Sequence, residues 1–127
     1  MVKLTPILFA IILTGCHKDI SKVIIPTKIE PDKDNPLCLN TTFHYNNSNG
    51  PKKLAIILKV SPNFKAIGVC SNGKLKPSQT SKHLWYLLEQ KNYTIEIILQ
   101  KIPPFANIQE VQNFKGKCIE IFIKRPT

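Results

Sequence analysis

The sequence predicts an all-β domain of about seven strands. Three observations carry this prediction: apolar and polar side chains alternate over several segments, β-branched residues are frequent there, and turn-forming residues separate the segments. The pattern is clearest where Tyr93, Ile95, Ile97 and Leu99 occupy every second position. A strand of this kind buries one face and leaves the other in solvent. The number and spacing of the candidate strands predict a β-sandwich.

Three strands are expected in the first half of the domain. Residues 37–43 form the first, and the Asn-Asn-Ser-Asn-Gly-Pro run at 46–51 forms a turn, because these residues tolerate left-handed or fixed φ angles. Residues 53–60 place aliphatic side chains on one face and form the second strand. Residues 64–71 form the third, and the Asn-Gly dipeptide at 72–73 ends it with a tight turn.

The segment 78–90 admits two interpretations. Three leucines between residues 84 and 88 have helical spacing and Ser78 is a suitable N-cap, so a small α+β domain with one helix at 78–90 is the alternative fold. The segment is short for a helix, however, and the strongest strand pattern follows it. Strands at 93–100 and 117–124 complete the chain.

Leu87 and Tyr93 suggest how the strands cross. A leucine six residues before a tyrosine, at the start of a late strand, is typical of the tyrosine corner of immunoglobulin-like sandwiches. There the phenol hydrogen-bonds to upstream backbone and fixes the crossing. The simpler interpretation makes Tyr93 an ordinary residue of an amphipathic strand. Together with the strand count, the pattern favours an immunoglobulin-like β-sandwich.

The first sixteen residues have the layout of an export signal. One positive charge, Lys3, precedes an apolar run at 4–13 that is too short to span a bilayer. The run ends in Leu-Thr-Gly-Cys at 13–16, which resembles the lipobox of bacterial lipoproteins, where an aliphatic and two small residues precede the lipid-carrying cysteine. An ordinary secretory peptide is the alternative.

The lipobox resemblance implies a membrane anchor. A signal peptide of residues 1–15 would be removed, and Cys16 would carry acyl chains such as palmitate, which together hold a protein firmly to a membrane. Because aspartate after the cysteine tends to retain Gram-negative lipoproteins in the inner membrane, His17 favours the outer membrane. We expect a periplasmic location, a tether at 16–35 and a single β-sandwich domain at 36–127.

The chain is strongly basic. Its formal net charge is +10, of which Lys3 in the signal contributes one. A basic surface favours acidic partners such as anionic lipid headgroups, nucleic acid or an acidic protein. An exported chain without an RNP-like aromatic pair or a zinc-finger spacing is not expected to bind nucleic acid.

Three cysteines follow Cys16, namely Cys38, Cys70 and Cys118. In an oxidising envelope two of them can form a disulfide while the third stays free, and the sequence does not determine the connectivity. A metal site is not expected, because the sequence has no Cys-x-x-Cys and no paired histidines.

The sequence shows no group of residues that would converge in an active site. His17, His44 and His83 are isolated, the acidic residues are spread out, and neither a Gly-x-Ser-x-Gly elbow nor a glycine-rich phosphate loop is present. We therefore expect no enzymatic activity, no cofactor and no small-molecule substrate.

The chain resembles the family of type VI secretion immunity periplasmic lipoproteins. Three features carry the likeness: the lipobox at 13–16 with its polar tether, a strand containing Cys38 with Cys70 at the end of the next hairpin, and the segment 87–97 followed by a closing strand at 117–124. The resemblance implies an immunity protein that binds a toxic effector delivered to the periplasm and blocks it sterically.

The resemblance also directs attention to particular residues. Together with the apolar, strand-like surroundings of both cysteines, it favours a disulfide between Cys38 and Cys70. Aromatic anchors and basic side chains are common in binding sites. The candidate partner-binding residues are Trp85, Tyr86, Lys52, Lys53, Lys74 and Lys76. A core position for Trp85 is the alternative.

Two other functional classes fit the sequence. One is a structural or assembly lipoprotein of the cell envelope, whose lysines would gather on one face. The other is a secreted viral or animal glycoprotein that modulates a host, since Asn40, Asn46 and Asn92 each begin an Asn-x-Ser/Thr sequon. The sequence does not identify the effector, its activity or the oligomeric state.

Overall fold

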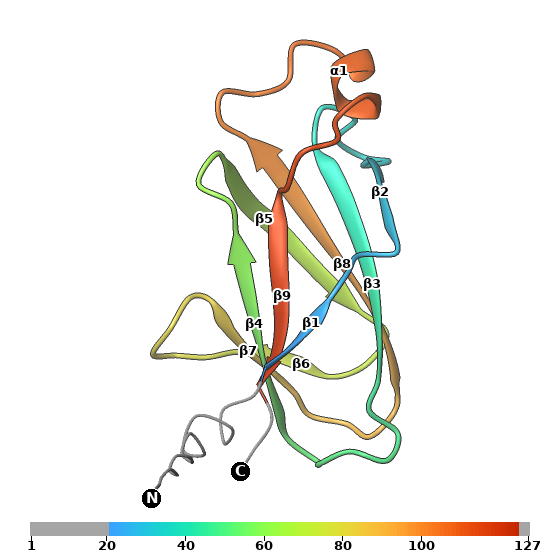
Figure 1. Cartoon of the computed structure of the whole chain (residues 1–127), viewed down its shortest axis with the longest axis vertical. Coiled ribbons are helices and arrows are strands. Elements are labelled where there is room, and N and C mark those ends of the chain that lie inside the picture. Colours follow the sequence, from blue (N-terminus) through green and yellow to red (C-terminus); the bar gives the residue numbers. More distant parts are fainter. Residues whose placement is uncertain (1–20, 125–127) are drawn as a thin grey trace, which may run out of the picture.

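A computed structural model describes residues 21–124, which form two antiparallel sheets packed face to face (Figure 1). In spatial order, the five-stranded sheet A contains β1 (Ser21–Ile24), β9 (Ile119–Lys124), β4 (Leu54–Val60), β7 (Leu84–Leu87) and β6 (Leu75–Pro77). The four-stranded sheet B contains β2 (Lys28–Pro31), β3 (Leu39–Asn46), β8 (Asn92–Lys101) and β5 (Phe64–Ser71). The predicted all-β sandwich is confirmed.

The core lies between the two sheets and is built by alternation. In β8 every second residue is buried, beginning with Tyr93 at 1% exposure and continuing through Ile95, Ile97 and Leu99. Sheet A supplies the facing side chains by the same rule. Its fully buried residues on β4 and β9 are Ile56, Ile121 and Ile123. The residues between these positions point outward and remain available for function.

Successive strands pass back and forth between the sheets, as β3, β5 and β8 belong to sheet B while β4, β7 and β9 belong to sheet A. The predicted turn at 46–51 makes the crossing from β3 to β4. Asn47 is buried there, and its side-chain amide donates to the carbonyl oxygens of Pro51 and Glu89, each at 3.0 Å. A Cβ at Gly50 would lie 1.9 Å from the Asn47 Oδ1 atom, so the turn requires glycine at this position.

Tyr93 makes the corner that its spacing from Leu87 predicted. Its hydroxyl donates to the Lys74 carbonyl oxygen at 2.7 Å and accepts from the Glu89 N–H at 3.0 Å. Burial raises the pKa of Tyr93, so the phenol keeps its donor to a higher pH than an exposed tyrosine would. The two hydrogen bonds connect the start of β8 to the segments that flank β6 and β7.

Besides β6, which was not predicted as a strand, the structure differs from the sequence prediction in three segments. β1 and β2 lie inside the range 16–35 that was assigned to a tether; they are four-residue strands that pair with β9 and β3. The alternative helix at 78–90 is wrong, because residues 84–87 form β7 between β4 and β6.

The third difference is a short helix, α1 (Ile108–Gln112), in the connection before β9. Asn107 caps it by accepting from the Glu110 N–H at 3.0 Å, and the Glu110 carboxylate accepts from the Ala106 N–H at 2.9 Å. The Glu110 side chain thus bonds to the residue before the cap, whereas in a capping box it would accept from the N–H of the cap residue itself. The connection packs Phe105 and Phe114 against Phe64, with ring centroids 5.4 to 6.3 Å apart, and so closes this end of the sandwich.

We expect Tyr93→Phe to lower the free energy of unfolding by about 1–2 kcal/mol, because it leaves a partly buried carbonyl and N–H without their partner. Urea unfolding followed by circular dichroism measures the change. Tyr86→Phe is the control, since its ring lies on an outer face, and it should cost less than about 0.5 kcal/mol. Equal effects of the two substitutions would contradict a structural role for the corner.

Candidate functional site

The outer face of sheet A carries an apolar row that crosses four strands. The registers place Val23 beside Phe122, Phe122 beside Ile57, and Ile57 beside Leu84. Paired residues of antiparallel strands point to the same side, and these four alternate with residues of the same strands that are buried or pack against the core. Val23 is 55% exposed, while the other three are half-buried by their neighbours.

A second row beside the first carries positive charge. Lys124 lies opposite Ala55, Ala55 opposite Tyr86, and Tyr86 opposite Lys76. The Lys53 ammonium lies 4.4 Å from the centre of the Tyr86 ring, a cation–π contact. We call these two rows together the sheet A face: Val23, Phe122, Ile57, Leu84, Lys124, Ala55, Tyr86 and Lys76, with Lys53 over Tyr86.

The acidic residue on the outer side of β9 is compensated. Glu120 lies on the outer side of β9, opposite Lys59 on β4, and forms an ion pair with Lys117 at 3.2 Å. The lysines beside Tyr86 therefore leave the sheet A face with net positive charge. An aromatic ring and aliphatic side chains surrounded by cations are suited to a partner that offers apolar and acidic groups.

Three of the six predicted partner-binding residues meet on this face: Tyr86, Lys53 and Lys76. Trp85 does not, because it alternates with Tyr86, lies opposite Ile56 and packs against the core. Lys52 is exposed in the turn before β4. Lys74 is exposed before β6, and its backbone N–H donates to the Glu89 carboxylate at 2.6 Å.

The apolar row was not predicted from the sequence. The alternation rule already contained the signal, because Phe122 and Ile57 stand at the positions between the inward-facing residues of their strands. Large apolar side chains at outward-facing positions are unusual and indicate a contact surface when they adjoin one another.

The predicted disulfide between Cys38 and Cys70 is wrong. Both belong to sheet B, but β8 separates their strands, and the registers place Cys70 opposite Glu96 and Glu96 opposite Thr42, four residues beyond Cys38. Two strand spacings and four residues of rise put the two Cα atoms about 17 Å apart, whereas a disulfide requires about 4.4–6.8 Å. Within residues 21–124 all three cysteines are free thiols.

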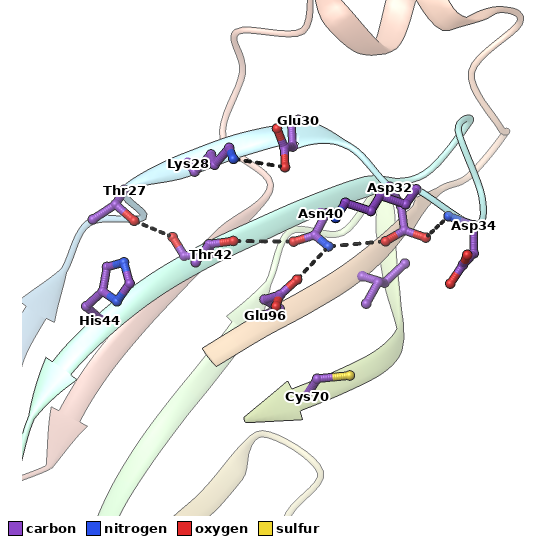
Figure 2. A pocket seen from close by; sticks show the side chains of 12 residues that line it. Thr27, Lys28, Glu30, Asp32, Asp34, Asn40, Thr42, His44, Cys70 and Glu96 are labelled. Carbon is purple, nitrogen blue, oxygen red and sulfur yellow. Dashed lines mark hydrogen bonds and ion pairs between the residues drawn. The ribbon is translucent and has the colours of Figure 1, made fainter. Parts of the chain in front are cut away.

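A hollow of about 600 Å³ lies on the outer face of sheet B (Figure 2). Four carboxylate side chains line it: Glu30, Asp32, Asp34 and Glu96. Asn40 stands between two of them and donates from its side-chain nitrogen to Asp32 at 3.1 Å and to Glu96 at 3.0 Å. Lys28, which pairs with Glu30 at 3.3 Å, and Lys33 also line the hollow, so its lining carries two more carboxylates than lysines.

The Asp32 carboxylate has a structural role. Its second oxygen accepts from the backbone N–H groups of Asp34 and Asn35, which holds the loop between β2 and β3. Among the described residues, no group of three or more histidines, cysteines or acids is arranged to hold a metal ion. We interpret the polar network as a brace between β3 and its neighbours.

The network also bears on the sequons. Asn40 is buried, and the nitrogen to which a glycan would be attached is the atom that donates to Asp32 and Glu96. Asn46 and Asn92 are exposed, at paired ends of β3 and β8. A glycan on Asn40 is therefore incompatible with this fold.

Comparisons with protein-family models, curated proteins and solved structures give no match to this chain. The resemblance to immunity lipoproteins therefore stays a prediction. No helix within residues 21–124 is long and apolar enough to cross a membrane. Cys16 and the signal segment lie outside the described residues.

We expect the three free thiols to react at different rates. Cys70 is exposed, whereas burial raises the pKa of Cys38, with a further contribution from the Asp32 charge, and burial also raises the pKa of Cys118. A raised pKa leaves less thiolate at a given pH. In a Cys16→Ser background at pH 8, Cys70 should react with a thiol reagent at least about tenfold faster than Cys38 and Cys118. Cys70→Ser should remove the fast phase, and a fast phase that survives would contradict the assignment.

We expect Asn40→Asp to destabilise the fold by about 2 kcal/mol or more, because it replaces a donor between two carboxylates with a third negative charge. Asn46→Asp is the matched control on the same strand, since Asn46 is exposed and its oxygen accepts from Ser48. Thermal and urea unfolding of both variants provide the test. If Asn46→Asp lowered the free energy of unfolding as much as Asn40→Asp, the hydrogen bonds of Asn40 would not be what stabilises the fold.

Proposed function

We propose that this protein is a bacterial lipoprotein, anchored through Cys16 at the periplasmic face of the envelope, that binds a toxic protein effector and neutralises it. In this proposal it is a type VI secretion immunity protein. The observation that carries the proposal is the sheet A face, where an apolar row across four strands adjoins Tyr86 and three lysines.

The composition of the sheet A face suits recognition of another protein. Tyrosine is enriched among the residues that dominate binding energy, and the neighbouring aliphatic side chains exclude water from such an anchor. The lysines add long-range attraction to an acidic partner and speed the encounter. Steric occlusion needs only such a surface, and no reacting group.

The anchor would keep this surface near the membrane. The strand β1 begins at Ser21, five residues after Cys16, and five residues span at most about 18 Å. Since β1 is an edge strand of sheet A, an acylated Cys16 would place that edge close to the lipid headgroups. An effector acting in the periplasm or on the membrane would then meet the protein near its target.

Membrane attachment is tested by radioactive palmitate and by fractionation. The wild-type chain should take up label and sediment with outer membranes, and Cys16→Ser should do neither. An unlabelled wild-type chain, or a Cys16→Ser protein that still sediments with membranes, would refute the anchor.

Neutralisation is tested by survival. We would export the product of the neighbouring gene to the periplasm of a tester strain, with and without this lipoprotein. Rescue of growth together with co-purification of the two proteins supports immunity. A harmless neighbour, or killing that this protein does not relieve, would instead favour the structural role in the envelope.

The face itself is tested by charge reversal. Lys53→Glu with Lys76→Glu should weaken binding to the neighbour's product by at least about tenfold, and Tyr86→Ala should do the same, because both remove anchors from one surface. Lys115→Glu is the control, an exposed lysine before β9 that lies off the sheet A face. Co-purification and a titration by calorimetry measure the effect. Normal binding by the charge-reversed variant would exclude the sheet A face as the binding surface.

A further inference from the structure

A second cavity opens on the side of the sandwich where β5 forms the edge of sheet B. Its volume is about 700 Å³, within the range of small-molecule sites. It lies between β4 and β7 of sheet A and β5 of sheet B, so it enters the space between the two sheets. We call it the side groove.

The apolar lining of the side groove is made of core side chains. Leu58, Ile97 and Ile119 are buried residues of the central strands, while Val69 and Trp85 are half-buried and pack against the same core. A molecule in the groove would therefore contact the inter-sheet core itself. Such a lining accepts a hydrocarbon chain and offers little to a polar ligand.

The charged groups of the groove all have one sign. Lys65 comes from β5, and Lys82 comes from the loop that precedes β7. His83 is exposed beside Lys82, and its carbonyl oxygen accepts from the Leu58 N–H at 2.8 Å, which attaches the loop to β4. None of the described residues lining the groove is acidic. The acidic residues of sheet B lie on its outer face, in the hollow around Asn40.

We infer that the side groove binds a fatty acid: its hydrocarbon chain lies against Leu58, Trp85 and Ile97, and Lys65 and Lys82 hold its carboxylate at the mouth. Apolar lining alone would accept many occupants, but the two exposed cations select an anionic headgroup. A carboxylate is small enough to sit at the mouth while a single chain enters between the sheets. This site is separate from the sheet A face and does not depend on the proposed immunity role.

Trp85 provides a direct test, because it is the single tryptophan of the chain and lines the groove. The full chain carrying Cys16→Ser would be titrated with 12-bromododecanoate below its micelle concentration. Bromine quenches tryptophan fluorescence only at close contact, so binding should quench Trp85, whereas unbrominated dodecanoate should not. Shortening the chain by two methylenes should weaken binding by roughly tenfold.

Variants separate this site from nonspecific adsorption. Lys65→Gln with Lys82→Gln should weaken binding of the brominated acid by about fivefold and leave the neutral 12-bromododecanol unchanged. Lys59→Gln with Lys124→Gln removes the same amount of charge from the outer side of sheet A. This variant should bind both the brominated acid and 12-bromododecanol as the unsubstituted protein does. Val69→Phe should fill the groove and reduce the quenching by both compounds.

Three outcomes would overturn the inference. One is the absence of quenching by the brominated acid. Another is equal weakening by the two lysine pairs, which would indicate only general attraction to a basic protein. The third is binding that does not depend on chain length. The lysine substitutions lie at the surface, so the test stays decisive even where Val69→Phe does not fold.

Discussion

Burial of every second side chain between the two sheets is the constraint on which the rest of the structure depends. In β8 this rule removes Tyr93, Ile95, Ile97 and Leu99 from water, and the facing strands of sheet A supply their partners. The hydrophobic free energy gained there is what orders the strands, since a single hairpin is at best marginally stable. The Tyr93 phenol adds a directional restraint at one end of the same strand.

The same constraint determines where function can lie. Because the inner faces are committed to the core, recognition must use the outer faces or the open side between the sheets. The two outer faces differ in charge: lysines surround Tyr86 on sheet A, while carboxylates surround Asn40 on sheet B. A strongly basic chain thus keeps a cluster of carboxylates on one outer face, and the positive charge around Tyr86 favours an acidic partner on the other.

The sequence predicted the fold class and the central strands because their period-two pattern is local. It also predicted the corner at Tyr93, whose spacing from Leu87 is short. The disulfide prediction failed because cysteine pairing depends on which strands are neighbours. Strand β8 lies between the strands of Cys38 and Cys70, and a local sequence pattern does not reveal the order of strands in a sheet. The sequence predicted part of the sheet A face, namely Tyr86, Lys53 and Lys76. It did not predict Lys124 or the apolar row, which exists only once four distant strands are in register.

The most direct test of the central claim is lysine footprinting of the protein in cells, with and without the neighbouring gene's product. The account predicts that Lys53, Lys76 and Lys124 lose reactivity toward an amine reagent when the partner is present. Lys28 and Lys33, beside the hollow on sheet B, should stay unchanged. Protection of Lys28 and Lys33 in place of the other three would contradict the account and place the binding surface on sheet B.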